Sequence, residues 1–134
     1  VAMLLGWVYT YMSQDDAAIE QFQRAQRLSP LHPQIGVTTA GIANALFQKG
    51  DIEAAVTYYE QSLTEYPEFA TTHLGLMGCY WALGRYDDSA RMAEWFRAKV
   101  PDMSVSIFQR TRPHENPFFR EAIIAALIGN GFPP

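Results

Sequence analysis

The chain has 134 residues, of which 49% are hydrophobic, and its formal net charge at pH 7 is −4. This length suits one domain, and this apolar content is enough to form a core, which argues against wholesale disorder. Acidic and basic residues are interspersed without a basic stripe, so we do not expect nucleic-acid binding. The single cysteine, Cys79, excludes an internal disulfide framework and is expected to be a buried thiol.

Neither a membrane span nor a secretion signal is expected. The sequence has no run of 18 apolar residues, and its first residues lack a charged leader and a cleavage site. The chain does not begin with Met. We therefore expect a cytoplasmic fragment of a longer protein that binds no membrane.

Apolar residues recur at helical spacing in six segments separated by turns. The predicted helices span residues 1–12, 15–28, 34–49, 52–66, 71–83 and 86–100. Gly50 and Gly84 suit left-handed helix ends, and Asp51 suits an N-cap. The second, fourth and sixth helices are each followed by a proline, which disfavours helix at the preceding residue: Pro30, Pro67 and Pro101.

After Pro101 the pattern changes. We expect a short helix over residues 103–110, a turn over 112–117 and a last helix over 118–128. Asn116 is the expected cap of the last helix, and Pro117 suits its first position. The last helix is apolar on more than one side, since Arg120 and Glu121 are its only charged residues.

The glycine and proline residues that mark the turns recur at a fixed spacing. Gly84 and Pro101 each lie 34 residues after their counterparts Gly50 and Pro67. An upstream copy precedes its counterpart by 37 residues, with the three extra residues in the turn at 31–35, and matches Ala55, Tyr59, Ser62 and Pro67 with Ala18, Phe22, Ala25 and Pro30. It also carries a Leu-Gly-x-x-Tyr pattern, namely Leu5, Gly6 and Tyr9.

This period and pattern resemble the tetratricopeptide repeat. The resemblance implies an all-α fold, a right-handed α-α superhelix of three helix pairs plus C-terminal capping helices. The units cover about residues 1–33, 34–69 and 70–103, and residues 104–134 form a C-terminal extension. Thr39 and His73 stand where the family usually has Trp, and we expect His73 to be packed or half-exposed.

The resemblance also implies a concave groove lined by the first helix of each pair. The expected protein-binding or peptide-binding residues are Trp7, Tyr11, Asn44, Phe47, Gln48, Leu74 and Trp81. An alternative for Phe47 and Trp81 is burial between neighbouring repeats. Since neither Lys nor Arg stands at these positions, we do not expect a free acidic C-terminal peptide as the ligand.

A second resemblance involves the tail. It is similar to the C-terminal tail of bacterial class III adenylate cyclases in which tetratricopeptide repeats follow the cyclase domain. The matching residues are Arg110, Pro113, Asn116, Pro117, Ala126, Leu127, Gly131, Phe132 and Pro133. This resemblance implies a non-catalytic regulatory or assembly part of such an enzyme, with the catalytic domain elsewhere.

We find no catalytic, cofactor or metal constellation in the sequence. His32, His73 and His114 are far apart, and the chain has no second cysteine. The acidic pairs at 15–16 and 87–88 fit the positive ends of helices. We therefore predict a protein–protein interaction module that is not an enzyme and has no cofactor.

The alternative is a structural module whose apolar last helix mediates homodimerisation or fills the groove. That helix offers six apolar residues for this purpose: Phe118, Phe119, Ile123, Ile124, Leu127 and Ile128.

Overall fold

The computed structural model describes residues 1–112 and 116–134. Within these residues it contains eight helices and no strand. The helices are α1 (Ala2–Tyr11), α2 (Asp15–Leu28), α3 (Ile35–Gln48), α4 (Ile52–Glu65), α5 (Ala70–Ala82), α6 (Tyr86–Lys99), α7 (Val105–Thr111) and α8 (Pro117–Gly129). The turn expected over 112–117 includes Pro113, His114 and Glu115, which lie outside the described residues.

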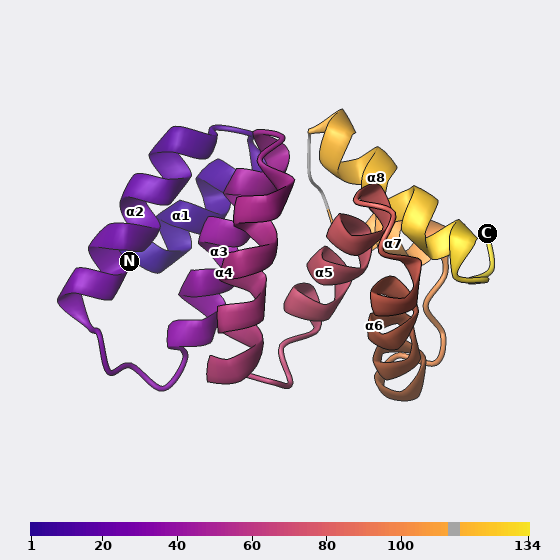
Figure 1. Ribbon diagram of the computed structural model, residues 1–134. Helices are drawn as coiled ribbons and strands as arrows, with labels where there is room; N and C mark the ends of the chain where they lie inside the picture. Colours follow the sequence, from indigo (N-terminus) through magenta and orange to yellow (C-terminus); the bar gives the residue numbers. More distant parts are fainter. Residues whose placement is uncertain (113–115) are drawn as a thin grey trace.

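The first six helices form three hairpins that stack side by side (Figure 1). Helices α1 and α2, α3 and α4, and α5 and α6 pack as pairs. Each later pair joins the stack through its first helix, because α3 packs on α2 and α5 packs on α4. The prediction of an all-α helical repeat superhelix is therefore confirmed.

The turns inside the hairpins have the geometry that the sequence indicated. Gly50 and Gly84 adopt positive φ angles of 90° and 76°, a region that costs an L side chain about 1–2 kcal/mol. In the first hairpin Ser13 takes this role at a φ of 57°. Asp51 caps α4, since its Oδ1 accepts a hydrogen bond from the Ala54 N–H at 3.3 Å.

Large and small residues interlock between the paired helices. Phe22 in α2 and Tyr59 in α4 occupy equivalent positions and are both fully buried. In α6 this position is Ala93, and Phe96, about one turn later, is also fully buried. His73 is 4% exposed and stacks on Trp95 with ring centroids 3.5 Å apart, so it is packed as predicted.

The C-terminal extension returns to the repeats. Helix α8 packs mainly on α5 and also contacts α3 and α7 (Figure 1). The tail closes on α7, because the Val105 N–H donates to the Pro133 carbonyl at 2.9 Å and the Ser106 N–H donates to the Pro134 carbonyl at 3.0 Å. Phe132 is 7% exposed beneath the guanidinium of Arg97.

Candidate protein-interaction site

The seven predicted groove residues lie on α1, α3 and α5, the first helices of the three pairs. Trp7, Tyr11 and Trp81 are partly exposed. The other four are buried, with at most 5% of each residue exposed: Asn44, Phe47, Gln48 and Leu74. In this arrangement the surface that a ligand can reach among these seven residues is therefore limited to the three aromatic side chains.

Trp7, on the first unit, lies beside aromatic rings of its own helix and of the end of the second unit. Its indole lies 6.1 Å from the Tyr11 ring and 6.4 Å from the Phe69 ring, measured between centroids. Phe69, at the start of α5, stacks on Tyr66 at 5.7 Å. All four side chains are partly exposed, and we call Trp7, Tyr11, Tyr66 and Phe69 the aromatic cluster. The Trp7 Nε1 has no hydrogen-bond partner among the described residues.

Tyr66 and Phe69 were not predicted as site residues. They flank the turn at Pro67, whereas the family pattern draws attention only to the first helix of each pair. The presence of two aromatic residues beside a turn proline could have indicated a binding surface, because an exposed turn rarely needs two large rings for its own stability.

Helix α8 contacts the side of α3 and α5 that carries Phe47, Gly78 and Trp81, and we call this side the inner face of the second and third units. The ring of Phe47 lies 4.8 Å from that of Phe119 and 6.1 Å from that of Phe118. A Cβ added at Gly78 would stand 2.6 Å from Cδ1 of Ile123, so the absence of a side chain on α5 is what lets α8 approach. One turn later the indole of Trp81 lies against Gly129 of α8.

The polar residues predicted for the groove make hydrogen bonds inside the protein, Asn44 through its side-chain oxygen and Gln48 through its backbone carbonyl. Asn44 is fully buried, and its Oδ1 accepts a hydrogen bond from the Tyr59 hydroxyl. Burial also raises the pKa of Tyr59 well above its usual range, so the hydroxyl remains a donor. The backbone carbonyl of Gln48 accepts a hydrogen bond from Asn116 Nδ2 at 3.2 Å.

The extension also reaches the first unit. Asn116 Nδ2 donates to Ser13 Oγ at 3.0 Å, and Asn116 Oδ1 accepts the Phe119 N–H at 2.9 Å as the cap of α8. At the end of α7, burial lowers the pKa of the Arg112 guanidinium, and the nearby Tyr11 side chain partly opposes that shift. The border between the aromatic cluster and the extension therefore lies near Tyr11.

The six apolar residues proposed for self-association are divided between the interior and the surface. Phe119, Ile123 and Leu127 are at most 2% exposed within the chain's own core, and Ile124 is partly buried. Phe118 and Ile128 are 46% and 61% exposed. A dimer that uses α8 in this position would therefore rest mainly on the exposed parts of Phe118 and Ile128.

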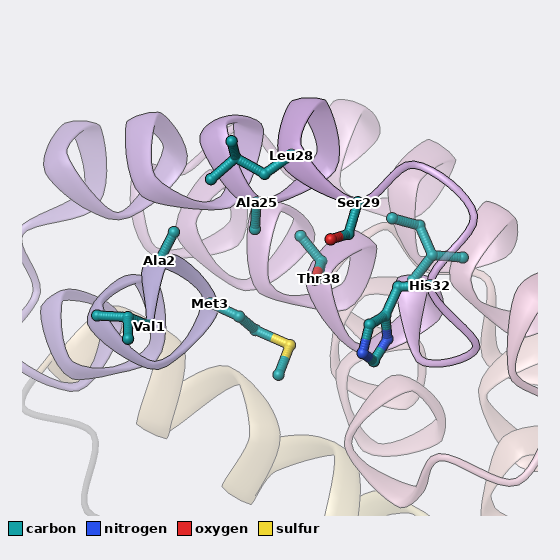
Figure 2. A pocket seen from close by; sticks show the side chains of 9 residues that line it. Val1, Ala2, Met3, Ala25, Leu28, Ser29, His32 and Thr38 are labelled. Carbon is teal, nitrogen blue, oxygen red and sulfur yellow. The ribbon is translucent and has the colours of Figure 1, made fainter.

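A separate cavity of about 270 Å³ opens where α1 begins, α2 ends and α3 begins (Figure 2). Its lining is mostly apolar, and its polar side chains are Ser29, His32 and Thr38. The Nδ1 of His32 already accepts the Gln34 N–H at 3.0 Å.

In the described part of the chain, every helix is too short or too polar to span a membrane. Residues 1–112 and 116–134 contain no group of three or more His, Cys, Asp or Glu side chains placed to hold a metal ion.

Comparison with known families identifies the repeats independently. One tetratricopeptide-repeat family model matches residues 1–30, and a second matches residues 46–94. No curated protein matches the chain. Tetratricopeptide repeats generally mediate protein–protein interactions and are typically non-catalytic, which indicates a protein partner for this chain. Spacing, hairpin stacking and both family matches agree, and the chain belongs to the tetratricopeptide repeat family.

Proposed function

We propose that the chain is a protein-interaction module that binds a segment of another protein at the aromatic cluster. One observation carries this proposal. Four partly exposed aromatic side chains converge from α1 and from the turn before α5, whereas Phe47 and Leu74, at inner-face positions of the later units, are buried.

The chemistry of the cluster suits a peptide ligand. Rigid aromatic side chains lose little conformational freedom on binding, and a true interface hot spot is worth about 2 kcal/mol or more. The Trp7 Nε1 is buried and lacks an acceptor among the described residues. Its indole therefore contributes apolar ring surface to the cluster. The aromatic cluster contains no Lys or Arg, so apolar contact would supply most of the affinity, with the Arg112 guanidinium near Tyr11 as the neighbouring positive charge.

The test selects peptides against the intact chain from a random library and measures their affinity by fluorescence anisotropy. Tyr11→Ala is expected to weaken binding by about tenfold or more, since an aromatic anchor is lost. Tyr86→Ala is the matched control, because Tyr86 is 54% exposed on α6, outside the cluster. Selected peptides that bind both variants as tightly as the unaltered chain would refute the proposal.

A second candidate function is structural, with α8 acting as an internal ligand for the inner face of the second and third units. The contacts of Ile123 with Gly78 and of Phe119 with Phe47 favour it. Gly78→Leu would fill the space that Ile123 occupies beside α5. Ala82→Leu is the matched control, because it adds the same side chain at an exposed position of α5.

Hydrogen exchange distinguishes these two variants. We expect Gly78→Leu to speed amide exchange in α8 by about tenfold or more while α3 and α4 stay protected, and Ala82→Leu to leave α8 unchanged. Equal exchange of α8 in both variants would reject the internal-ligand role. Light scattering on the same samples tests the homodimer, which requires twice the monomer mass.

We also infer that the chain is a regulatory or assembly part of a larger cytoplasmic bacterial protein, such as a class III adenylate cyclase. The tail pattern supports this inference. In the fold its residues close the extension: Gly131 turns at a φ of 84°, Phe132 lies under Arg97, and the Pro133 carbonyl accepts from Val105. Sequencing the parent gene tests it, and a parent without a cyclase domain would remove the cyclase assignment.

A further inference from the structure

Helix α1 carries an apolar stripe that no described part of the chain covers. Val1, Leu4, Leu5 and Val8 are 96%, 67%, 40% and 50% exposed, and we call these four residues the outer stripe. Their spacing places them along one side of α1. This surface lies on the first helix of the first pair and is distinct from the aromatic cluster.

The repeat itself identifies what such a stripe packs against. The residues of α3 equivalent to the outer stripe are buried, as are those of α5: Thr38, Gly41, Ile42 and Ala45 in α3, and Thr72, Gly75, Leu76 and Cys79 in α5. The second helix of the preceding pair covers them, α2 on α3 and α4 on α5. Both interfaces therefore show the same arrangement of an amphipathic helix against this side of a first helix.

We propose that the outer stripe is a docking surface for an amphipathic α-helix of a partner helical hairpin, which lies on α1 as α2 lies on α3. This proposal is independent of ligand binding at the aromatic cluster. It extends an interface that the chain already contains twice.

The outer stripe also limits the size of one side chain on that helix. Gly41 and Gly75 lie directly under the aromatic rings of Phe22 and Tyr59, and neither has room for a Cβ. The equivalent residue of α1 is Leu4. A ring at the position of Phe22 would collide with the Leu4 side chain, so the docked helix carries a small residue there.

A second copy of this chain does not supply such a helix. Phe22 and Tyr59 put rings at the critical position of α2 and α4. Helix α6 has the small residue Ala93 there, but Ala93 is 0% exposed in one core cluster with Met103 and Phe108 of the extension. The side of α6 that would dock is therefore already covered.

The experiment uses a peptide copy of residues 51–66, the region of α4, as the probe. A lactam between Glu53 and a Lys introduced by Thr57→Lys holds the peptide helical, and both positions are exposed in α4. One peptide keeps Tyr59 and the other carries Tyr59→Ala. Their affinities for the intact chain and its variants are measured by fluorescence anisotropy.

We expect the Tyr59→Ala peptide to bind the unaltered chain about tenfold more tightly than the Tyr59 peptide. Leu4→Gly is expected to reverse this preference, since it restores the space found above Gly41 and Gly75. Val8→Glu is expected to abolish binding of both peptides. Leu83→Glu, a matched change at a residue that is 38% exposed on another surface, is expected to leave binding intact.

Three results overturn the proposal. The first is no saturable binding of the Tyr59→Ala peptide up to about 500 µM. The second is binding that survives Val8→Glu or does not depend on the size of residue 4. The third is a dimer of the unaltered chain in sedimentation analysis that Val8→Glu converts to a monomer, because a second copy would then occupy the stripe.

Discussion

The side-chain nitrogen of Asn116 lies 3.0 Å from the hydroxyl oxygen of Ser13, which is 103 residues earlier in the sequence. The same nitrogen donates to the Gln48 carbonyl at 3.2 Å, and the side-chain oxygen caps α8 through the Phe119 N–H at 2.9 Å. One residue therefore starts the last helix and ties it to the ends of α1 and α3.

Replacing Asn116 tests both of its roles. Asn116→Ala is expected to lower the free energy of unfolding by about 1–2 kcal/mol, since it removes the cap and the two long-range bonds. Asn116→Asp keeps the capping oxygen but loses the donor, so a smaller loss is expected. Urea denaturation measures both. Equal stability of both variants and the unaltered chain would show that these bonds do not hold α8.

Two adjacent phenylalanines provide a matched pair for the packing of α8. Phe119 is 2% exposed against Phe47, whereas Phe118 is 46% exposed. Phe119→Ala should lower the free energy of unfolding by about 3–5 kcal/mol because it leaves a core cavity. Phe118→Ala should cost about 1 kcal/mol or less. Similar losses in urea denaturation for both would contradict the observed orientation of α8.

The burial of His73 should make the free energy of unfolding depend on pH. Burial is the main cause that lowers its pKa below the usual value of 6.5, against smaller opposing effects of a hydrogen bond with the Pro67 carbonyl and of Glu68. Its Nε2 lies 2.7 Å from that carbonyl and so donates to it, and Nδ1 has no partner among the described residues. A second proton on Nδ1 therefore favours the unfolded state.

The contribution of neutral His73 to the free energy of unfolding is thus complete above the pKa of this residue in the unfolded chain. It is lost as the pH falls below about 6.5 towards the lower pKa of the folded chain. The free energy of unfolding should decrease between about pH 7.5 and 5.5, and His73→Gln should decrease less, because Gln can donate to Pro67 but does not titrate. Chemical denaturation at both pH values measures the difference. Parallel decreases in the two proteins would exclude His73 as the cause.

Cys79 provides a probe of local opening. The thiol is fully buried on α5, and burial raises its pKa far above the ordinary value. Because the thiolate is the reactive form, Cys79 is expected to react with a disulfide reagent at pH 8 only as fast as the protein opens, and fully once it is unfolded in urea. Complete reaction of the native chain at the rate of a free thiol would be incompatible with this burial.

The repeat fold follows from the sequence because its signals are local and recur. Helical spacing, Gly50 and Gly84 at the turns, and a proline after each pair give the first six helices within two residues of their observed ends. Asn116 and Pro117 likewise indicate the start of α8, and the structure confirms Asn116 as its cap.

The position of α8 was not predictable in the same way, because no repeat relates α8 to the units that it contacts. Its apolar residues indicated a second buried side, but choosing between α5 and another chain depends on long-range fit. Gly78 supplies that fit by leaving room for Ile123, and in the sequence it is one more glycine in an apolar helix. The same contact with α8 explains the burial of Phe47.

A nuclear Overhauser measurement on the Cδ1 methyl group of Ile123 tests most directly whether α8 covers the inner face of its own repeats. We expect cross-peaks to the Gly78 Hα and to the Phe47 ring in uniformly labelled chain, and none of them in a mixture designed to detect contacts between different molecules. Absence of these cross-peaks in the folded chain, or their appearance only between molecules, would contradict the claim that α8 covers the inner face of its own repeats.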